Sequence, residues 1–174
     1  MTDRMTAEER HRCMAAIKSK DTKPEIMVRK YLFSRGLRYR VNVKKLPGSP
    51  DIVLKKYGVA IFIDGCFWHG HKDCKYYKLP STNVDYWKAK IARNMARDYV
   101  NNVDLELLGW RVFRLWECEI KTKAQREETL EELYKKIVSG VNIRKPKKIR
   151  QRKKRQYDDY PDDFNFAAEA EEEY

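Results

Sequence analysis

Residues 59–74, VAIFIDGCFWHGHKDC, begin as an apolar run and end in a cluster of metal-binding and acid–base side chains. The successive apolar residues VAIFI are typical of a strand that is buried on both faces. Because such a sheet needs helices on both sides, the segment predicts a layered α/β fold. The strand leads at once into side chains suited to binding metals or moving protons: Asp64, Cys66, His69, His71 and Cys74. We therefore expect a site at its carboxyl end.

The preceding segment, Asp51-Ile52-Val53-Leu54, is expected to pair with this strand through a tight turn at Tyr57-Gly58. If that turn contains two residues, Asp51 lies directly opposite Asp64, with the two Cβ atoms about 5 Å apart. Facing carboxylates repel each other unless a cation lies between them or one of them is protonated. The pair predicts a divalent metal site, and the alternative is an exposed pair with no function.

Helix and strand signals alternate along the rest of the first 140 residues. Thr6–Glu9 and Thr22–Glu25 have the pattern of capping boxes, which predict helices at about 7–18 and from 23 to Arg35-Gly36. A long helix at 83–106, with Thr82 and Asp85 as a further box, has an apolar stripe that includes Tyr99. Its basic side is either solvated or faces phosphate. Further strands are expected at 37–43 and 110–116, and a last helix at 123–138.

The charge of the chain favours a polyanionic partner. The formal net charge is +12, and residues 141–174 contribute only 9 Lys/Arg against 8 Asp/Glu, which leaves about +11 on residues 1–140. A folded body this basic is typical of nucleic-acid-binding proteins. We expect one domain at 1–140, in which residues 1–20 form a DNA-contacting helix, and a disordered basic then acidic tail at 141–174.

Neither export nor membrane insertion is indicated. The N-terminus has no apolar signal region, and no apolar run approaches about 18 residues. We expect a cytoplasmic protein, in which cysteines serve as metal ligands or free thiols rather than disulfides.

Three cysteines and one histidine have the spacing of a zinc site. Cys66-x4-His71-x2-Cys74, followed later by Cys118, supplies a complete tetrahedral set with no open position, so the site would be structural. Cys118 follows a strand end, as Cys66 does, and parallel neighbouring strands would bring the two together. The alternative is a chance grouping of free thiols, because Cys13 shows that the chain carries a spare cysteine.

The residues between the zinc ligands suggest catalysis and DNA contact. If His71 points at zinc, His69 is free to act as a general base, and Gly70 gives the backbone the latitude to separate them. The alternative for His69 is a surface histidine. Phe67 and Trp68 would be held rigidly outward, which suggests wedges between base pairs. Trp87 would either join these wedges or pack in the core.

The stretches SKDTKPE, LPGSPDIV, FIDGCFWHGHKDC and LGWRVFRLWECE carry a specific resemblance that spans about residues 10–138. In them the chain resembles the very-short-patch-repair (Vsr) DNA mismatch endonucleases. The resemblance implies a restriction-endonuclease-like fold, in which a mixed sheet is flanked by helices. It also implies a Mg²⁺-dependent nick in double-stranded DNA, 5′ to the mismatched thymine of T·G pairs that arise by 5-methylcytosine deamination. We expect a nucleoid-associated monomer, with mismatch-repair proteins as possible partners.

The same resemblance implies a role for each matching residue. Asp51 and the backbone carbonyl of Ile63 would hold Mg²⁺, and His69 would be the general base, supported by Glu25. Zinc would be held by Cys66, His71, Cys74 and Cys118. DNA would be contacted by intercalating Phe67, Trp68 and Trp87, and by the N-terminal helix through Met14.

One residue departs from the family pattern. Asp64 stands where the best-known member has a second catalytic histidine, and an aspartate cannot supply positive charge to a transition state. It would instead ligate the metal or orient a water molecule, and Asp98 matches another acidic position of the family.

Two other functions fit the same residues. One is a homing- or restriction-type endonuclease that cuts fully paired duplex, and the other is a catalytically inactive, zinc-stabilised DNA-binding module.

Overall fold

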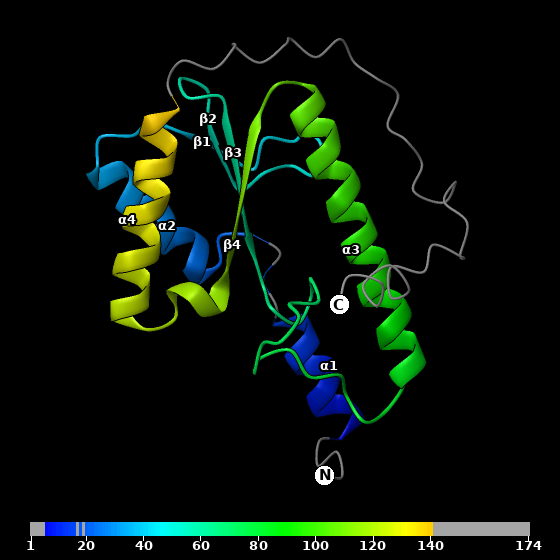
Figure 1. Cartoon of the computed structure of the whole chain (residues 1–174). Helices are drawn as coiled ribbons and strands as arrows, with labels where there is room; N and C mark the ends of the chain where they lie inside the picture. The colour runs from blue at the N-terminus through cyan, green and yellow to red at the C-terminus, as the bar shows by residue number, and fades with distance from the viewer. Residues whose placement is uncertain (1–5, 17, 19, 141–174) are drawn as a thin grey trace.

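The computed structural model of the chain describes residues 6–16, 18 and 20–140 (Figure 1). Its centre is a four-stranded sheet in the order β1-β2-β3-β4. The strands β1, β2 and β3 pair antiparallel, whereas β3 and β4 pair parallel, so the sheet is mixed. The strands are β1 (Arg40–Val41), β2 (Ile52–Leu54), β3 (Val59–Asp64) and β4 (Arg111–Trp116). The helices are α1 (Ala7–Ala15), α2 (Lys23–Ser34), α3 (Val84–Leu107), the 3₁₀ helix η1 (Glu117–Ile120) and α4 (Lys123–Ser139).

Helices cover both faces of the sheet, as the sequence predicts. Figure 1 shows α2 and α4 on one side of the strands and α3 on the other. Ile52, Leu54 and Ile61 are fully buried against residues of α2 and α4. Ala60 and Phe62 project to the opposite face and share a second buried cluster with a leucine of α3. Each face of β2 and β3 therefore has its own apolar core.

The β2–β3 register differs from the predicted one. Leu54 pairs with Val59, so the connection contains four residues rather than two. Two successive turns close it, because the amide of Tyr57 donates to the carbonyl of Leu54 and that of Gly58 to the carbonyl of Lys55. The prediction that Asp51 directly faces Asp64 is therefore wrong. A displacement of two residues leaves every side chain on its expected face, because strand side chains alternate.

The starts of α1 and α2 were predicted correctly, whereas the start and the buried face of α3 differ from the prediction. Thr6 and Thr22 both form the expected capping boxes. By contrast, Asn83 rather than Thr82 precedes α3, and its side chain forms no capping bond. Tyr99 of α3 is exposed, and the helix buries Asn94 and Asn101 in addition to apolar residues. The strand expected at 37–43 is reduced to β1.

No helix within residues 6–16, 18 and 20–140 is long and apolar enough to cross a membrane. The tail at 141–174, expected to be disordered, lies outside the described residues.

Candidate active site and metal centre

The parallel pairing of β3 and β4 creates the site. Asp64 at the end of β3 lies opposite Trp116 at the end of β4, so the chain leaves both strands at the same edge of the sheet. The loop after β3 then meets η1, where the Glu117 carboxylate accepts a hydrogen bond from the amide of Cys66 at 3.1 Å. This bond fixes the start of the loop that carries Cys66, His69 and the aromatic residues.

The predicted zinc ligands come together at this edge. Ligand atoms of Cys66, His71, Cys74 and Cys118 all lie within 4.8 Å of one another. The Nδ1 atom of His71 lies 3.5 Å from the sulfur of Cys66 and 3.4 Å from that of Cys118. A tetrahedral Zn²⁺ with Zn–S bonds of about 2.3 Å and Zn–N bonds of about 2.0 Å has N···S edges of about 3.5 Å. The four side chains therefore fit zinc in chemistry and in dimensions.

Two further features suit this cluster to a cation. The imidazole of His71 stacks on the Trp116 ring, with the centroids 4.0 Å apart and the planes within 2°. This contact holds the ring in the orientation from which Nδ1 faces the thiols. Burial raises the pKa of Cys66 to about 12, so its thiolate is costly alone and is stabilised by a bound metal.

Gly70 separates the two histidines of the loop. Its φ angle is +63°, and an added Cβ would lie 2.7 Å from the sulfur of Met95 and 3.0 Å from Cγ2 of Ile91. Glycine is thus required there for both conformation and space. His71 turns toward the cysteines, while His69 turns toward α3 and the carboxylates of Asp64 and Asp98.

His69 is held by two carboxylates. Its Nδ1 atom lies 2.5 Å from Oδ2 of Asp98 and 3.7 Å from Oδ1 of Asp64. Nδ1–H donation to Asp98 leaves Nε2 as the proton-accepting nitrogen. Burial by itself lowers the pKa of His69, but the hydrogen bond to Asp98 and the two negative charges outweigh it and raise the pKa. Burial likewise opposes ionisation of Asp98, yet the His69 bond and the nearby cations lower its pKa.

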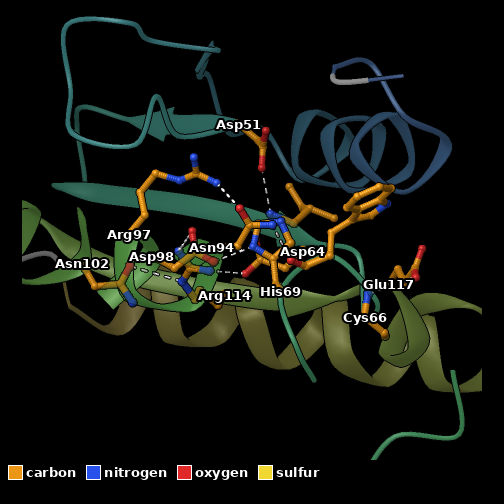
Figure 2. Close-up of polar contacts among 12 residues, drawn as sticks. Asp51, Asp64, Cys66, His69, Asn94, Arg97, Asp98, Asn102, Arg114 and Glu117 are labelled. Atoms are coloured by element: carbon orange, nitrogen blue, oxygen red, sulfur yellow. Dashed lines mark hydrogen bonds and ion pairs between the residues drawn. The ribbon is translucent and has the colours of Figure 1, made fainter. Parts of the chain in front are cut away.

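Arg114 completes this group from β4 (Figure 2). Its guanidinium lies 2.5 Å from Asp64 Oδ2 and 3.5 Å from Asp98 Oδ1. Burial raises the pKa of Asp64, although the charges of Arg114 and His69 oppose the rise. We did not predict Arg114 from the sequence. The signal available in the sequence was an arginine at a strand position whose side chain points between the sheet and a helix. A cation in such a place requires an acidic partner.

Asp51 lies beside β3 but does not face Asp64 directly. Its Oδ2 accepts a hydrogen bond from the amide of Ile63 at 2.8 Å. Burial raises the pKa of Asp51 to about 6, and the charges of Glu25 and Asp64 add to the rise, whereas the Ile63 bond and Arg29 oppose it. The Asp51 carboxylate thus occupies a negative region that a divalent cation would stabilise.

Glu25 belongs to the Asp51 side of the site. It is buried and accepts hydrogen bonds from Arg29 Nη2 at 2.6 Å and from the amides of Asp21 and Thr22 at 3.0 and 3.3 Å. Both carboxylate oxygens are therefore engaged at the start of α2. His69 is oriented by the hydrogen bond that its Nδ1–H donates to Asp98, so any support from Glu25 acts at longer range.

The aromatic residues form one cluster next to this site. The Phe67 ring centroid lies 5.2 Å from that of Trp68 and 5.3 Å from that of Trp87, with edge-to-face geometry. All three side chains are half-buried, so Trp87 belongs to this cluster rather than to the core. Asn94 of α3 donates to the Trp68 carbonyl at 2.9 Å and fixes the loop beneath the rings. Met14, on α1, is 42% exposed.

Comparison with known proteins finds relatives that align with most of the chain. The family described as DNA mismatch endonuclease Vsr matches residues 2–76. The type II nicking enzyme V.NmeAIP of Neisseria meningitidis is 48% identical over 141 residues, covering 81% of this chain and 100% of the relative. The type II nicking enzyme V.XorIIP of Xanthomonas oryzae is 44% identical over 130 residues, covering 75% and 95%.

A third relative carries the family name itself. The DNA mismatch endonuclease Vsr of Escherichia coli is 37% identical over 141 residues, which cover 80% of this chain and 90% of the relative. These relatives are endonucleases that act on DNA, and the identity extends over nearly their whole length. The chain belongs to the Vsr family of DNA endonucleases.

Proposed function

We propose that the protein nicks double-stranded DNA on the 5′ side of the mismatched thymine in T·G pairs that arise by deamination of 5-methylcytosine. The observation that carries this proposal is the position of His69. It is oriented as a base by Asp98 and lies in the same short loop as the zinc ligands and two aromatic residues. Relatives named as nicking enzymes and as a mismatch endonuclease support the choice of substrate. A restriction-endonuclease-like arrangement of the mixed sheet is consistent with this chemistry.

Two cations would serve the site in different ways. Cys66, His71, Cys74 and Cys118 would hold a structural Zn²⁺, which leaves no coordination position open for catalysis. Asp51 and the backbone carbonyl of Ile63 would hold Mg²⁺, which polarises the phosphate and stabilises charge on its oxygens when bound.

The residues of the chain supply the proton transfer. Nε2 of His69 accepts the proton of the attacking water while a new P–O bond forms and the bond to the leaving sugar oxygen breaks. Asp98 holds Nδ1–H, and the carboxylates of Asp98 and Asp64 stabilise the imidazolium that results. Asp64 contacts Arg114 through one oxygen and faces His69 with the other, so we place it with the base rather than on Mg²⁺.

The aromatic cluster would select the mismatch. Phe67, Trp68 and Trp87 are braced against one another, which suits side chains that wedge open a base step. Unstacking is less costly at a mismatch, and this difference supplies part of the selectivity. The exposed helix α1, with Met14, would contact the DNA from another side, and basic residues of α3 would contact phosphates.

The test is single-turnover nicking of a T·G duplex in Mg²⁺ by the wild type and by Asp51→Ala and His69→Ala. We expect the wild type to nick and each variant to lose at least about 100-fold in rate, with DNA affinity and zinc content retained. A wild type that binds the duplex but never cuts it would instead indicate a DNA-binding module.

A further inference from the structure

We propose that Arg114 is a positioning residue of the nicking site: its guanidinium bridges Asp64 and Asp98 and so holds in place the two carboxylates that orient His69. The inference rests on the proposed function and adds a residue that the metal-ligand and general-base roles leave out.

The position of Arg114 is set by the parallel register. Arg114 lies opposite Phe62, two pairs before the Asp64–Trp116 pair. Its side chain therefore projects on the α3 side of the sheet, where the guanidinium lies 4.8 Å from the centroid of the Phe62 ring. Nε donates to Oδ1 of Asn102 on α3 at 3.2 Å. The guanidinium is thus held by the Phe62 ring on β3 and by Asn102 on α3, and these two contacts fix the directions of its two Nη atoms.

Each Nη atom meets a different carboxylate. Nη1 lies 2.5 Å from Asp64 Oδ2, and Nη2 lies 3.5 Å from Asp98 Oδ1 (Figure 2). The other oxygens of the same carboxylates, Asp98 Oδ2 and Asp64 Oδ1, face Nδ1 of His69. Arg114 and His69 thus lie on opposite sides of one pair of carboxylates. The planar guanidinium can span the pair, which a single ammonium cannot do as well.

This arrangement solves an electrostatic problem. Asp64 is 3% exposed and Asp98 is also largely shielded, so two negative charges share a space of low dielectric. Neighbouring carboxylates repel each other unless a cation lies between them. The guanidinium of Arg114 is that cation, because it contacts both carboxylates and keeps them in place beside Nδ1 of His69.

The alternative is that Arg114 only pins β4 to α3, in which case its loss lowers stability and leaves the chemical step unchanged. The two roles differ in measurable ways. A positioning role predicts a fall in kcat at nearly constant KM, with recovery when a cation is restored. A purely structural role predicts loss of folded protein and unchanged kcat per folded molecule.

The experiment compares full-length wild type, Arg114→Met, Arg114→Lys and the double variant Asp64→Asn/Arg114→Met on a T·G duplex in Mg²⁺. Arg35→Met is the control, because it also removes one arginine and its ion pair with Glu131, on the helical layer formed by α2 and α4. Single-turnover rate, KM, DNA affinity without Mg²⁺, zinc content and melting temperature are measured for each.

We expect Arg114→Met to lower kcat by roughly 30- to 100-fold with KM and DNA affinity within about threefold of wild type. Arg114→Lys should recover only part of that loss, because it restores the charge but cannot span both carboxylates as the guanidinium does. The double variant removes both charges of the Asp64–Arg114 ion pair, so it should fold and should bind zinc even if Arg114→Met does not. Arg35→Met should match wild type.

A kcat for Arg114→Met within threefold of wild type, or equal rates for the Lys and Met variants, overturns the positioning role. Failure of the proposed function looks different, because the wild type itself would then show no nicking of the T·G duplex. If the wild type cuts paired DNA instead, the same variants are compared on that substrate, and the same differences decide the role of Arg114.

Discussion

His69 and Asp98 are joined by a 2.5 Å contact between Nδ1 and Oδ2, although they lie 29 positions apart on a loop and on α3. The contact fixes which imidazole nitrogen is free for chemistry. It also links the site to the long helix, because Asn94 on the same helix holds the carbonyl of Trp68. One helix therefore orients the imidazole of His69 and the loop of the aromatic cluster together.

Asp98→Ala should slow nicking because the imidazole loses the carboxylate that fixes its tautomer. We expect a fall of roughly 100-fold in single-turnover rate, with little change in DNA affinity. Glu106→Gln, which removes an exposed carboxylate from the same helix, should leave the rate unchanged. An Asp98→Ala enzyme as fast as the control would show that Asp98 does not orient the base.

Cys118→Ser should lose zinc and stability together, because a hydroxyl is a poor fourth ligand and the ligand set joins the segments that follow β3 and β4. Metal analysis and thermal melting of the purified protein test this. Cys13→Ser, outside the expected ligand set, should keep a full complement of zinc. Retention of one zinc per chain by Cys118→Ser would exclude it as a ligand.

Gly70→Ala should be destabilising for two separable reasons. A left-handed φ costs an L-residue about 1–2 kcal/mol, and the new methyl group would press on Met95 and Ile91. Gly36 has a φ of +80° with nothing within 4 Å of an added Cβ, so Gly36→Ala measures the conformational cost alone. We expect Gly70→Ala to exceed this control by about 1–3 kcal/mol in chemical denaturation and to lower nicking as well. Equal losses would mean that α3 yields to the methyl group.

Asp51→Asn should abolish nicking yet stabilise the protein in Mg²⁺-free buffer at pH 8. The pKa of Asp51 rises from 3.8 to about 6 on folding, so its contribution to stability is full below about pH 4 and is lost as pH rises through about 6. The amide variant avoids this loss and should gain about 2–3 kcal/mol at pH 8. Asp85→Asn, at an exposed carboxylate, should gain nothing. Identical pH profiles for wild type and Asp51→Asn would contradict the raised pKa.

The sequence patterns that act locally were the most informative. The capping boxes at Thr6 and Thr22, the buried strand of residues 59–63 and the Cys/His spacing all lead to the observed elements and grouping. Each depends on residues close in the chain, or on ligands that follow two adjacent strand ends.

The features that the sequence did not reveal depend on register between elements. The alternation of side chains along a strand places each residue on the same face of the sheet whether the turn has two residues or four. It therefore could not show whether Asp51 lies directly opposite Asp64. The parallel register that places Arg114 beside Asp64 has no local signal either. Asn94 was overlooked because the sequence pattern favours an apolar buried side for α3. In the structure, polar residues of α3 instead face the polar groups of the site: Asn94 contacts the carbonyl of Trp68, and Asn102 contacts Arg114.

A competition assay measures whether this site nicks DNA specifically at a T·G mismatch. The wild-type protein, in Mg²⁺, receives equal amounts of two duplexes that share every base except one, with T·G in one and C·G in the other. A panel of flanking sequences is used, and the cut positions are mapped on both strands. We predict a single nick, on the 5′ side of the mismatched thymine, in the T·G duplex alone. Equal cutting of both duplexes, or cleavage of both strands, would contradict a nicking activity specific for the T·G mismatch.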